Sequence, residues 1–184
     1  IILTFAFLMS GFFLLVSHIN LMDPEISHLM PVLNSPLLSI HVSIIMMGFA
    51  MLSITFICGV TALLSDFLSG FGGRSDRSVI DGQMDGLRLL SLLFLYPALA
   101  MLGIGIFVGA IWANVSWGTY WSWDAKETWA LITFMLYAIA VHSASLPWFR
   151  KPKFFHIFMV LAFLSILMTY FGVNYFLSGM HSYA

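Results

Sequence analysis

The chain has 184 residues, of which 61% are hydrophobic and 8% are charged, and its mean hydropathy is +0.99. A soluble domain carries about 25% charged residues, so this composition excludes an ordinary soluble protein and predicts an all-α, polytopic transmembrane helix bundle. The net charge of −1 gives no reason to expect nucleic-acid binding. The single cysteine, Cys58, excludes an internal disulfide and a CxxC or CxxCH motif.

The hydropathy pattern predicts about five membrane spans within one domain that covers residues 1–184. In chain order they are residues 1–17, 40–64, 86–113, 128–146 and 154–177. The first is just long enough to cross a bilayer. It has no basic start and no small-residue cleavage site, so it is not a signal peptide. Because the chain opens inside this apolar run, we expect it to start partway through a longer protein.

Four stretches separate these spans: residues 18–39, residues 65–85, the tryptophan-rich stretch after residue 113, and a short basic turn at residues 147–153. Within the third span, Pro97 predicts a kink, and Gly105 and Gly109, four residues apart, predict a face for close helix packing.

The basic residues predict the orientation of the chain. Six of the seven lie in or beside two loops: Arg74, Arg77, Arg88, Arg150, Lys151 and Lys153. Cytoplasmic loops carry the excess of Lys and Arg, so we expect both of these loops in the cytoplasm. Residues 18–39, the tryptophan-rich stretch and the tail would then share the outer face.

The tryptophan-rich stretch is the most distinctive part of the sequence. Residues 117–129 read WGTYWSWDAKETW, and five of the six tryptophans fall within residues 112–129, which we expect to form an outer loop. Packing a helix bundle does not require this concentration, whereas a flat apolar ligand with polar edges would use it. An aromatic belt is the alternative, but a belt decorates both interfaces, and Trp148 alone marks the inner one.

Polar residues in this stretch have both structural and ligand-binding interpretations. Asp124 suits a helix N-cap, and Glu127, three residues later, would complete a capping box. Lys126 would suit pairing with a carboxylate at the polar edge of such a ligand, and equally an ordinary interfacial position.

Two histidines are expected beside the tryptophans. His41 opens the second span and His181 follows the fifth, so both should lie at the outer boundary of the membrane. Two neutral imidazoles at one level can ligate a haem iron from opposite faces of the ring. His142 is expected deep in the fourth span, where an ionisable residue is a functional candidate, with a helix–helix hydrogen bond as the alternative. We expect His156 to be interfacial, and His18 and His28 to be ordinary loop residues.

These residues resemble a known family. The pattern Trp-Gly-x-x-Trp-x-Trp-Asp-x-Lys-Glu-Thr-Trp is similar to the "WWD" signature of haem-handling proteins, in the form found in the CcsA/ResC family of system II cytochrome c biogenesis. Four further landmarks match across residues 36–184: Ile40-His41-Val42, His142, Gly172-Val173-Asn174 and Gly179-Met180-His181-Ser182-Tyr183. The chain departs from the common pattern at Ala125, where many members have proline. Alanine is also a good helix former, so we expect the same geometry.

The resemblance implies a function. His41 and His181 would be the axial ligands that hold haem b on the outer face, and His142 would lie on the haem route across the membrane. A tryptophan-rich platform would carry the porphyrin, comprising Trp117, Gly118, Trp121, Trp123, Asp124 and Trp129, with Lys126 and Glu127 as support for a propionate or for the loop.

The same resemblance implies the partners and the reaction. The protein would act in a bacterial cytoplasmic or thylakoid membrane as a cytochrome c haem lyase. It would work together with a CcsB/ResB-type membrane protein, which would supply a second transmembrane histidine. The acceptor would be an apocytochrome c with a CxxCH segment, and no residue is assigned as a nucleophile or base.

Three alternatives remain open at the level of sequence. A b-type cytochrome subunit would pair histidines inside the spans, which leaves the tryptophans unexplained. A haem exporter or chaperone would use the same site without ligation activity of its own. A purely structural subunit would leave the clustering of His41, His181 and five tryptophans to chance.

Overall fold

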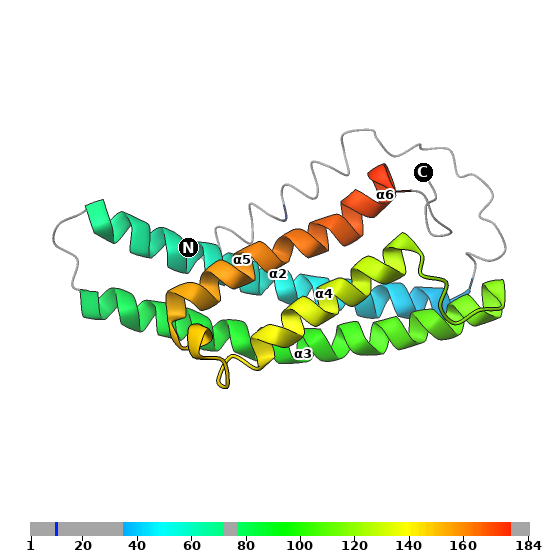
Figure 1. The fold of residues 1–184 in the computed structure, drawn as a ribbon, viewed down its shortest axis with the longest axis horizontal. Helices are drawn as coiled ribbons and strands as arrows, with labels where there is room; N and C mark the ends of the chain where they lie inside the picture. Colours follow the sequence, from blue (N-terminus) through cyan, green and yellow to red (C-terminus); the bar gives the residue numbers. More distant parts are fainter. Residues whose placement is uncertain (1–9, 11–34, 72–76, 178–184) are drawn as a thin grey trace.

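A computed structural model of the chain describes residue 10, residues 35–71 and residues 77–177 (Figure 1). The predicted first span apart from Ser10, most of the first loop, and the tail with His181 lie outside the described residues. Within the described residues every regular element is a helix, and the elements assemble into an all-α bundle of long apolar helices. The predicted fold class is therefore confirmed.

The described chain forms two long helices followed by a shorter pair. The elements are α2 (Pro36–Phe71), α3 (Arg77–Trp117), α4 (Ala125–Val141), a 3₁₀ turn η2 (Pro147–Arg150), α5 (Pro152–Leu167), a π-helical turn η3 (Met168–Gly172) and α6 (Val173–Phe176). The last three form one uninterrupted helical run of 25 residues.

Three of these helical runs are long and apolar enough to cross a membrane: Pro36–Gly70, Arg77–Trp117 and Pro152–Phe176. They correspond to the predicted second, third and fifth spans. The predicted fourth span is shorter than expected, because α4 has 17 residues and is about 25 Å long, less than the ~30 Å hydrocarbon core.

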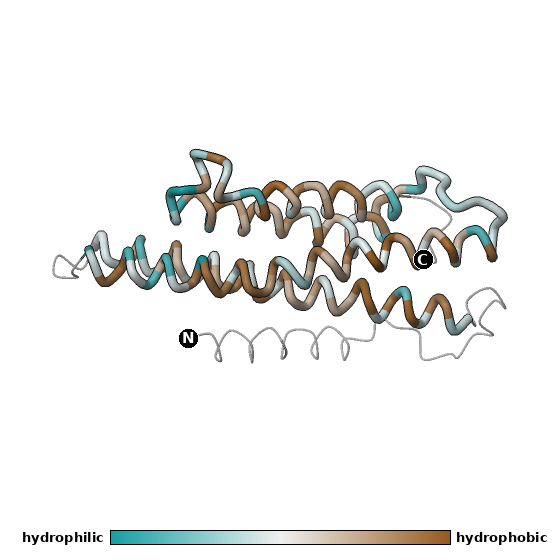
Figure 2. Tube along the Cα trace, turned by 90° about the horizontal axis from the view of Figure 1, so that it is seen from below, coloured by the Kyte–Doolittle hydropathy of each residue, from teal (hydrophilic) through white to brown (hydrophobic). Residues whose placement is uncertain are grey.

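The prediction of a loop over residues 65–85 was wrong for residues 65–71 and 77–85, which are the part that the structure describes. Helix α2 continues to Phe71 and α3 begins at Arg77. Ala62, Ile80 and Met84 form a small buried cluster between the two helices, so the polar residues of this stretch lie on the outside of a helical hairpin. Figure 2 shows hydrophilic residues gathered at this end of α2 and α3.

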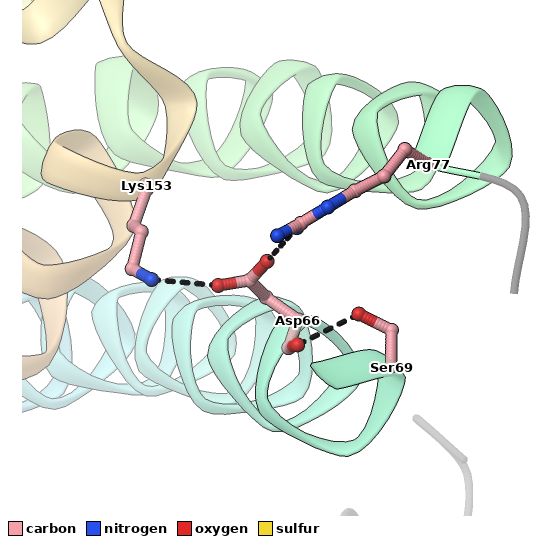
Figure 3. Close-up of polar contacts among 4 residues, drawn as sticks. All are labelled: Asp66, Ser69, Arg77 and Lys153. Carbon is pink, nitrogen blue, oxygen red and sulfur yellow. Dashed lines mark hydrogen bonds and ion pairs between the residues drawn. The ribbon is translucent and has the colours of Figure 1, made fainter. Parts of the chain in front are cut away.

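An acidic residue joins three helices at the same end of the bundle. The two carboxylate oxygens of Asp66 accept from Arg77 Nη1 at 2.9 Å and from Lys153 Nζ at 2.7 Å (Figure 3). These residues belong to α2, α3 and α5. Both predicted basic loops therefore meet at one end, which agrees with placing them on one side of a membrane. Exposed ion pairs contribute little free energy of folding. The cluster therefore mainly fixes how α2, α3 and α5 are aligned along one another at this end.

Small residues let the two long helices pack closely. The Cα of Gly48 on α2 faces the backbone oxygen of Ala98 and the side chain of Leu102 on α3, and an added Cβ would lie 3.3 Å from each. The main buried core then fills the space between α2, α3, α4 and α5. Its members are Phe49, Leu52, Leu95, Ala98, Leu102, Tyr137, Ala140, Phe149, Phe155, Met159, Ala162, Phe163 and Ile166.

His156 is not interfacial, contrary to the prediction. It is fully buried on α5, and its Nε2 lies 3.0 Å from the carbonyl oxygen of Met84 on α3. The basic turn before it suggested a position near water, but α3 extends past this level and covers the ring. His156 therefore contributes to packing between α3 and α5.

Candidate functional site

A cavity of about 280 Å³ lies at the end of the bundle opposite Asp66. It is formed by α2, α3, the stretch after α3, the first turns of α4 and the π-helical turn η3. Its walls are Leu38, His41, Val42, Ile45, Met46, Phe49, Ile106, Gly109, Ala110, Trp112, Tyr120, Trp121, Lys126, Glu127, Ala130, Thr169 and Tyr170. Most of these are apolar, so the cavity suits an apolar ligand with a few polar contacts.

His41 is fixed in the wall of this cavity by α3. Its Nδ1 lies 2.8 Å from the carbonyl oxygen of Gly105. A carbonyl oxygen accepts only, so Nδ1 carries the proton and the lone pair of the neutral ring is on Nε2. Metal-ligating histidines commonly use this arrangement, in which a backbone carbonyl sets the tautomer.

The predicted close-packing face of α3 is confirmed, and it is the seat of His41. A Cβ added to Gly109 would lie 2.6 Å from Cε1 and 2.8 Å from Nδ1 of the His41 ring. A Cβ added to Gly105 would collide with Ile45, one turn along α2. The two glycines therefore bring α2 against α3 and leave room for the imidazole between them.

The irregular stretch beside the cavity is shorter than the predicted loop. Helix α3 extends to Trp117 and α4 begins at Ala125, so only residues 118–124 are irregular. Gly118 ends α3 with a φ of 80°, and its N–H donates to the Asn114 carbonyl at 2.9 Å. Glycine adopts this left-handed conformation without steric cost, which accounts for the glycine of the motif.

Trp123 holds a strained backbone conformation, with a φ of 58°. Residues with a side chain rarely adopt such values, which cost about 1–3 kcal/mol and cluster at functional sites. Its indole is 72% exposed and meets Trp121 edge to face, with the ring centroids 5.8 Å apart. In this conformation Trp123 is exposed, whereas Trp121 lines the cavity.

The capping box predicted for α4 is confirmed. The Asp124 side chain accepts from the N–H of Lys126 at 3.1 Å, and Glu127 Oε2 accepts from the N–H of Asp124 at 3.3 Å. Glu127 Oε2 also accepts from the N–H of Ser122 at 2.9 Å. The two acidic residues therefore join the start of α4 to the stretch that carries the tryptophans.

The π-helical turn on the other side of the cavity is held by a buried hydrogen-bond network. Thr169 Oγ1 donates to the carbonyl of Ser165 at 2.7 Å, lies 3.0 Å from Thr133 Oγ1 and 3.2 Å from the carbonyl of Trp129. Two of these contacts reach α4. A π turn contains one extra residue and often marks a functional site, and here it places Thr169 and Tyr170 in the cavity wall.

Lys126 extends from the first turn of α4 toward α6. Its Nζ donates to Asn174 Oδ1 at 2.9 Å. Lys126 lies two residues before the predicted fourth span. Burial lowers the pKa of its ammonium from the ordinary value, and the negative charge of Asp124 acts in the opposite direction. Lys126 is thus a cation in the wall of a mostly apolar cavity.

The structure brings four of the predicted site residues into the cavity wall: His41, Trp121, Lys126 and Glu127. The other members of the predicted platform lie outside it, namely Trp117, Gly118, Trp123, Asp124 and Trp129. Sequence reasoning did not assign the other wall residues to the site, and among them are Trp112, Tyr120, Thr169 and Tyr170. Trp112 carried a signal, because it belongs to the tryptophan cluster, whereas the other three depend on the π turn and on the path of residues 118–124.

His142 does not lie inside a helix, contrary to the prediction. Helix α4 ends at Val141, and His142 is its exposed C-cap, followed by a turn in which Ser145 N–H donates to the His142 carbonyl at 2.9 Å. The serines after His142 compete for backbone hydrogen bonds, and Pro147 cannot continue a helix. Helix α4 therefore ends before the predicted span does. A role for His142 in haem passage remains a prediction.

Substitutions of Asp124 separate its structural role from a charge effect. We expect Asp124→Asn to keep the capping hydrogen bond and nearly normal stability, and Asp124→Ala to lower stability by about 1 kcal/mol. The measurement is thermal unfolding in detergent. An equal loss of stability in Asp124→Asn would instead show that the negative charge itself is required.

Comparison with known proteins identifies the family of the chain. The profile of the cytochrome C assembly protein family matches residues 1–181. Protein NrfI of Wolinella succinogenes is 41% identical over 184 residues, which are 99% of this chain and 20% of NrfI. The cytochrome c biogenesis protein CcsA of Parasynechococcus marenigrum is 38% identical over 178 residues, covering 84% of this chain and 57% of that protein.

The family match and these relatives therefore indicate that this helix bundle is a protein of cytochrome c biogenesis. The chain belongs to the cytochrome c assembly protein family, as the CcsA-like motif predicts. A second CcsA, from Prochlorococcus marinus strain MIT 9303, is 36% identical over 187 residues. The chain spans less than two thirds of the length of these relatives, 20% of NrfI and 57–58% of the two CcsA proteins.

Proposed function

We propose that the protein binds haem b in the His41 cavity on the outer face of the membrane and delivers it for covalent attachment to apocytochrome c. The observation that carries this proposal is the seating of His41. Its tautomer is set by the Gly105 carbonyl, its ring rests on Gly109, and it forms part of an apolar wall that also contains Trp121. Haem is the substrate, and His181 is its second proposed axial ligand.

The size of the cavity supports partial enclosure of the porphyrin. A volume of about 280 Å³ lies at the lower limit of ligand pockets, which span roughly 300–1,000 Å³. A haem seated there would keep one edge outside the protein. Ligation needs such an edge, because the vinyl groups must meet the cysteines of the acceptor.

The chain contributes positioning rather than acid–base chemistry. In the reaction each cysteine S–H of CxxCH adds across a vinyl double bond: a C–S bond forms at one vinyl carbon, and the hydrogen ends on the other. No net oxidation or reduction occurs. Held against the apolar wall, the vinyl groups and thiols would react at a high effective concentration. We infer that a CcsB/ResB-type partner completes the site and that His142 lies on the haem route.

The b-type cytochrome alternative has less support. Such a protein pairs histidines at one depth within its spans. Among the described residues, His41 lies at the cavity end of the bundle, whereas His142 and His156 lie on segments toward the other end. No specific observation favours a second function.

Replacement of the three proposed haem histidines tests the function. We expect His41→Ala and His181→Ala to lose the low-spin haem absorption of the purified whole protein and the maturation of cytochrome c in the same cells. Added imidazole should restore part of both, because it replaces the missing ligand. We expect His142→Ala to reduce the amount of haem that reaches the site.

His28→Ala is the matched control, because it removes a histidine that is predicted to be an ordinary residue of the outer loop. It should keep both haem and maturation. Normal haem content and maturation in His41→Ala and His181→Ala would show that these two residues are not ligands.

A further inference from the structure

The cavity wall contains a cation that is held by a neutral partner. Lys126 Nζ donates to Asn174 Oδ1 at 2.9 Å, and the amide of Asn174 is oriented because its Nδ2 donates to the Tyr170 carbonyl at 2.8 Å. Hydrogen bonds between an ammonium and a carboxylate are stronger than those to a neutral oxygen. A half-buried ammonium, which has lost part of its water, therefore gains when an anion replaces the amide.

The two nearest acidic residues have other contacts. Asp124 Oδ2 and Glu127 Oε2 accept from backbone N–H groups at the start of α4. The positive end of the helix dipole also stabilises their negative charges. They therefore hold the start of α4, whereas the Lys126 ammonium donates to Asn174.

A second donor lies in the same wall. Trp121 Nε1 is buried and has no hydrogen-bond acceptor among the described residues. The walls contributed by α2 and α3, in contrast, are mostly apolar, as in Val42, Ile45 and Ile106. A ligand that fits these walls has an apolar body and carries a carboxylate at one edge.

We propose that Lys126 is the carboxylate-binding residue of the cavity and that Asn174 holds it in position until an acidic ligand displaces the amide. This inference rests on the proposed function and deepens it, because it fixes how haem is oriented. The propionates would lie toward α4 and α6. The vinyl edge, on the opposite side of the porphyrin, would then lie away from Lys126 and remain accessible to the acceptor.

Binding of haem and of haem dimethyl ester to the whole protein in detergent tests the inference. The ester keeps the porphyrin and the iron but has no carboxylate. We expect the wild type to bind haem about tenfold more tightly than the ester, the worth of one charge-assisted contact. Lys126→Met should bind the two compounds equally, and Lys126→Arg should keep most of the preference.

Asn174 gives a test in the opposite direction. Asn174→Asp places a resident carboxylate beside Lys126 and should remove the preference for haem, whereas Asn174→Ala should keep or increase it. Lys151→Met, which removes a lysine from the turn before α5, is the control and should behave as the wild type. Equal affinity of the wild type for haem and ester, or a preserved preference in Lys126→Met, would overturn this inference alone. Failure of the wild type to bind either compound would overturn the proposed function with it.

Discussion

Replacement of Gly109 by alanine is expected to lower haem affinity about tenfold or more, although His41 itself is unchanged. The new Cβ would lie 2.6 Å from the His41 ring, so the imidazole must move or α2 must separate from α3. Overpacking of this kind costs about 1–3 kcal/mol, and either movement breaks the contact with the Gly105 carbonyl. The measurement is haem titration of the purified protein, followed by absorption.

Gly103→Ala is a matched control on the same helix. A Cβ added at Gly103 meets only the ring of Phe134 at 3.4 Å, an ordinary contact, and alanine favours helix more than glycine. This variant should keep wild-type affinity and stability. If added imidazole restores the haem absorption of the Gly109→Ala protein, the defect lies in the placement of His41 as an axial ligand. If Gly109→Ala binds haem as the wild type does, the seat on α3 does not position His41.

Replacement of Trp112 by alanine is expected to lower the free energy of unfolding by about 3–5 kcal/mol, the usual cost of removing a large buried aromatic side chain. Trp112 is 2% exposed, lines the cavity and meets Trp117 edge to face with the ring centroids 4.8 Å apart. Its loss would leave a void between the cavity and the end of α3. The measurement is equilibrium unfolding in mixed micelles.

Trp148→Ala is the control for this substitution. Trp148 is 75% exposed, and exposed positions change stability by about 0.5 kcal/mol or less. Trp112→Phe should recover part of the lost stability, because it refills part of the void. Equal stability of the Trp112→Ala and Trp148→Ala proteins would show that Trp112 does not support the end of α3.

Sequence reasoning predicted the elements whose signals are local. Asp124 and Glu127 have the spacing of a capping box, and Gly105 and Gly109 have the spacing of a packing face, so both predictions are confirmed. The all-α membrane class followed from composition. The two spacings depend on residues within about one helical turn, and the composition is a property of the whole chain. None of these three signals requires knowledge of the tertiary contacts.

The failures concern features that tertiary contacts decide. Residues 65–71 and 77–85 are helical, with Ile80 buried against α2 and Asp66 paired with cations from two other helices. His156 is buried because α3 extends past its level. The pairing of Lys126 with Asn174 joins residues 48 positions apart, and no periodicity in either segment predicts it.

The π turn at Met168–Gly172 has a consequence for how this chain tolerates changes in length. A π turn holds one residue more than the α-helical repeat, so deleting one residue within it would restore a regular helix. The residues after the deletion would keep nearly their present direction, because the turn already absorbs the extra residue. The same deletion within α5 would instead rotate every later residue by about 100° around the helix axis, and Asn174 would turn away from Lys126. The π turn is therefore a place where this helix can lose a residue and still keep the contact between Lys126 and Asn174.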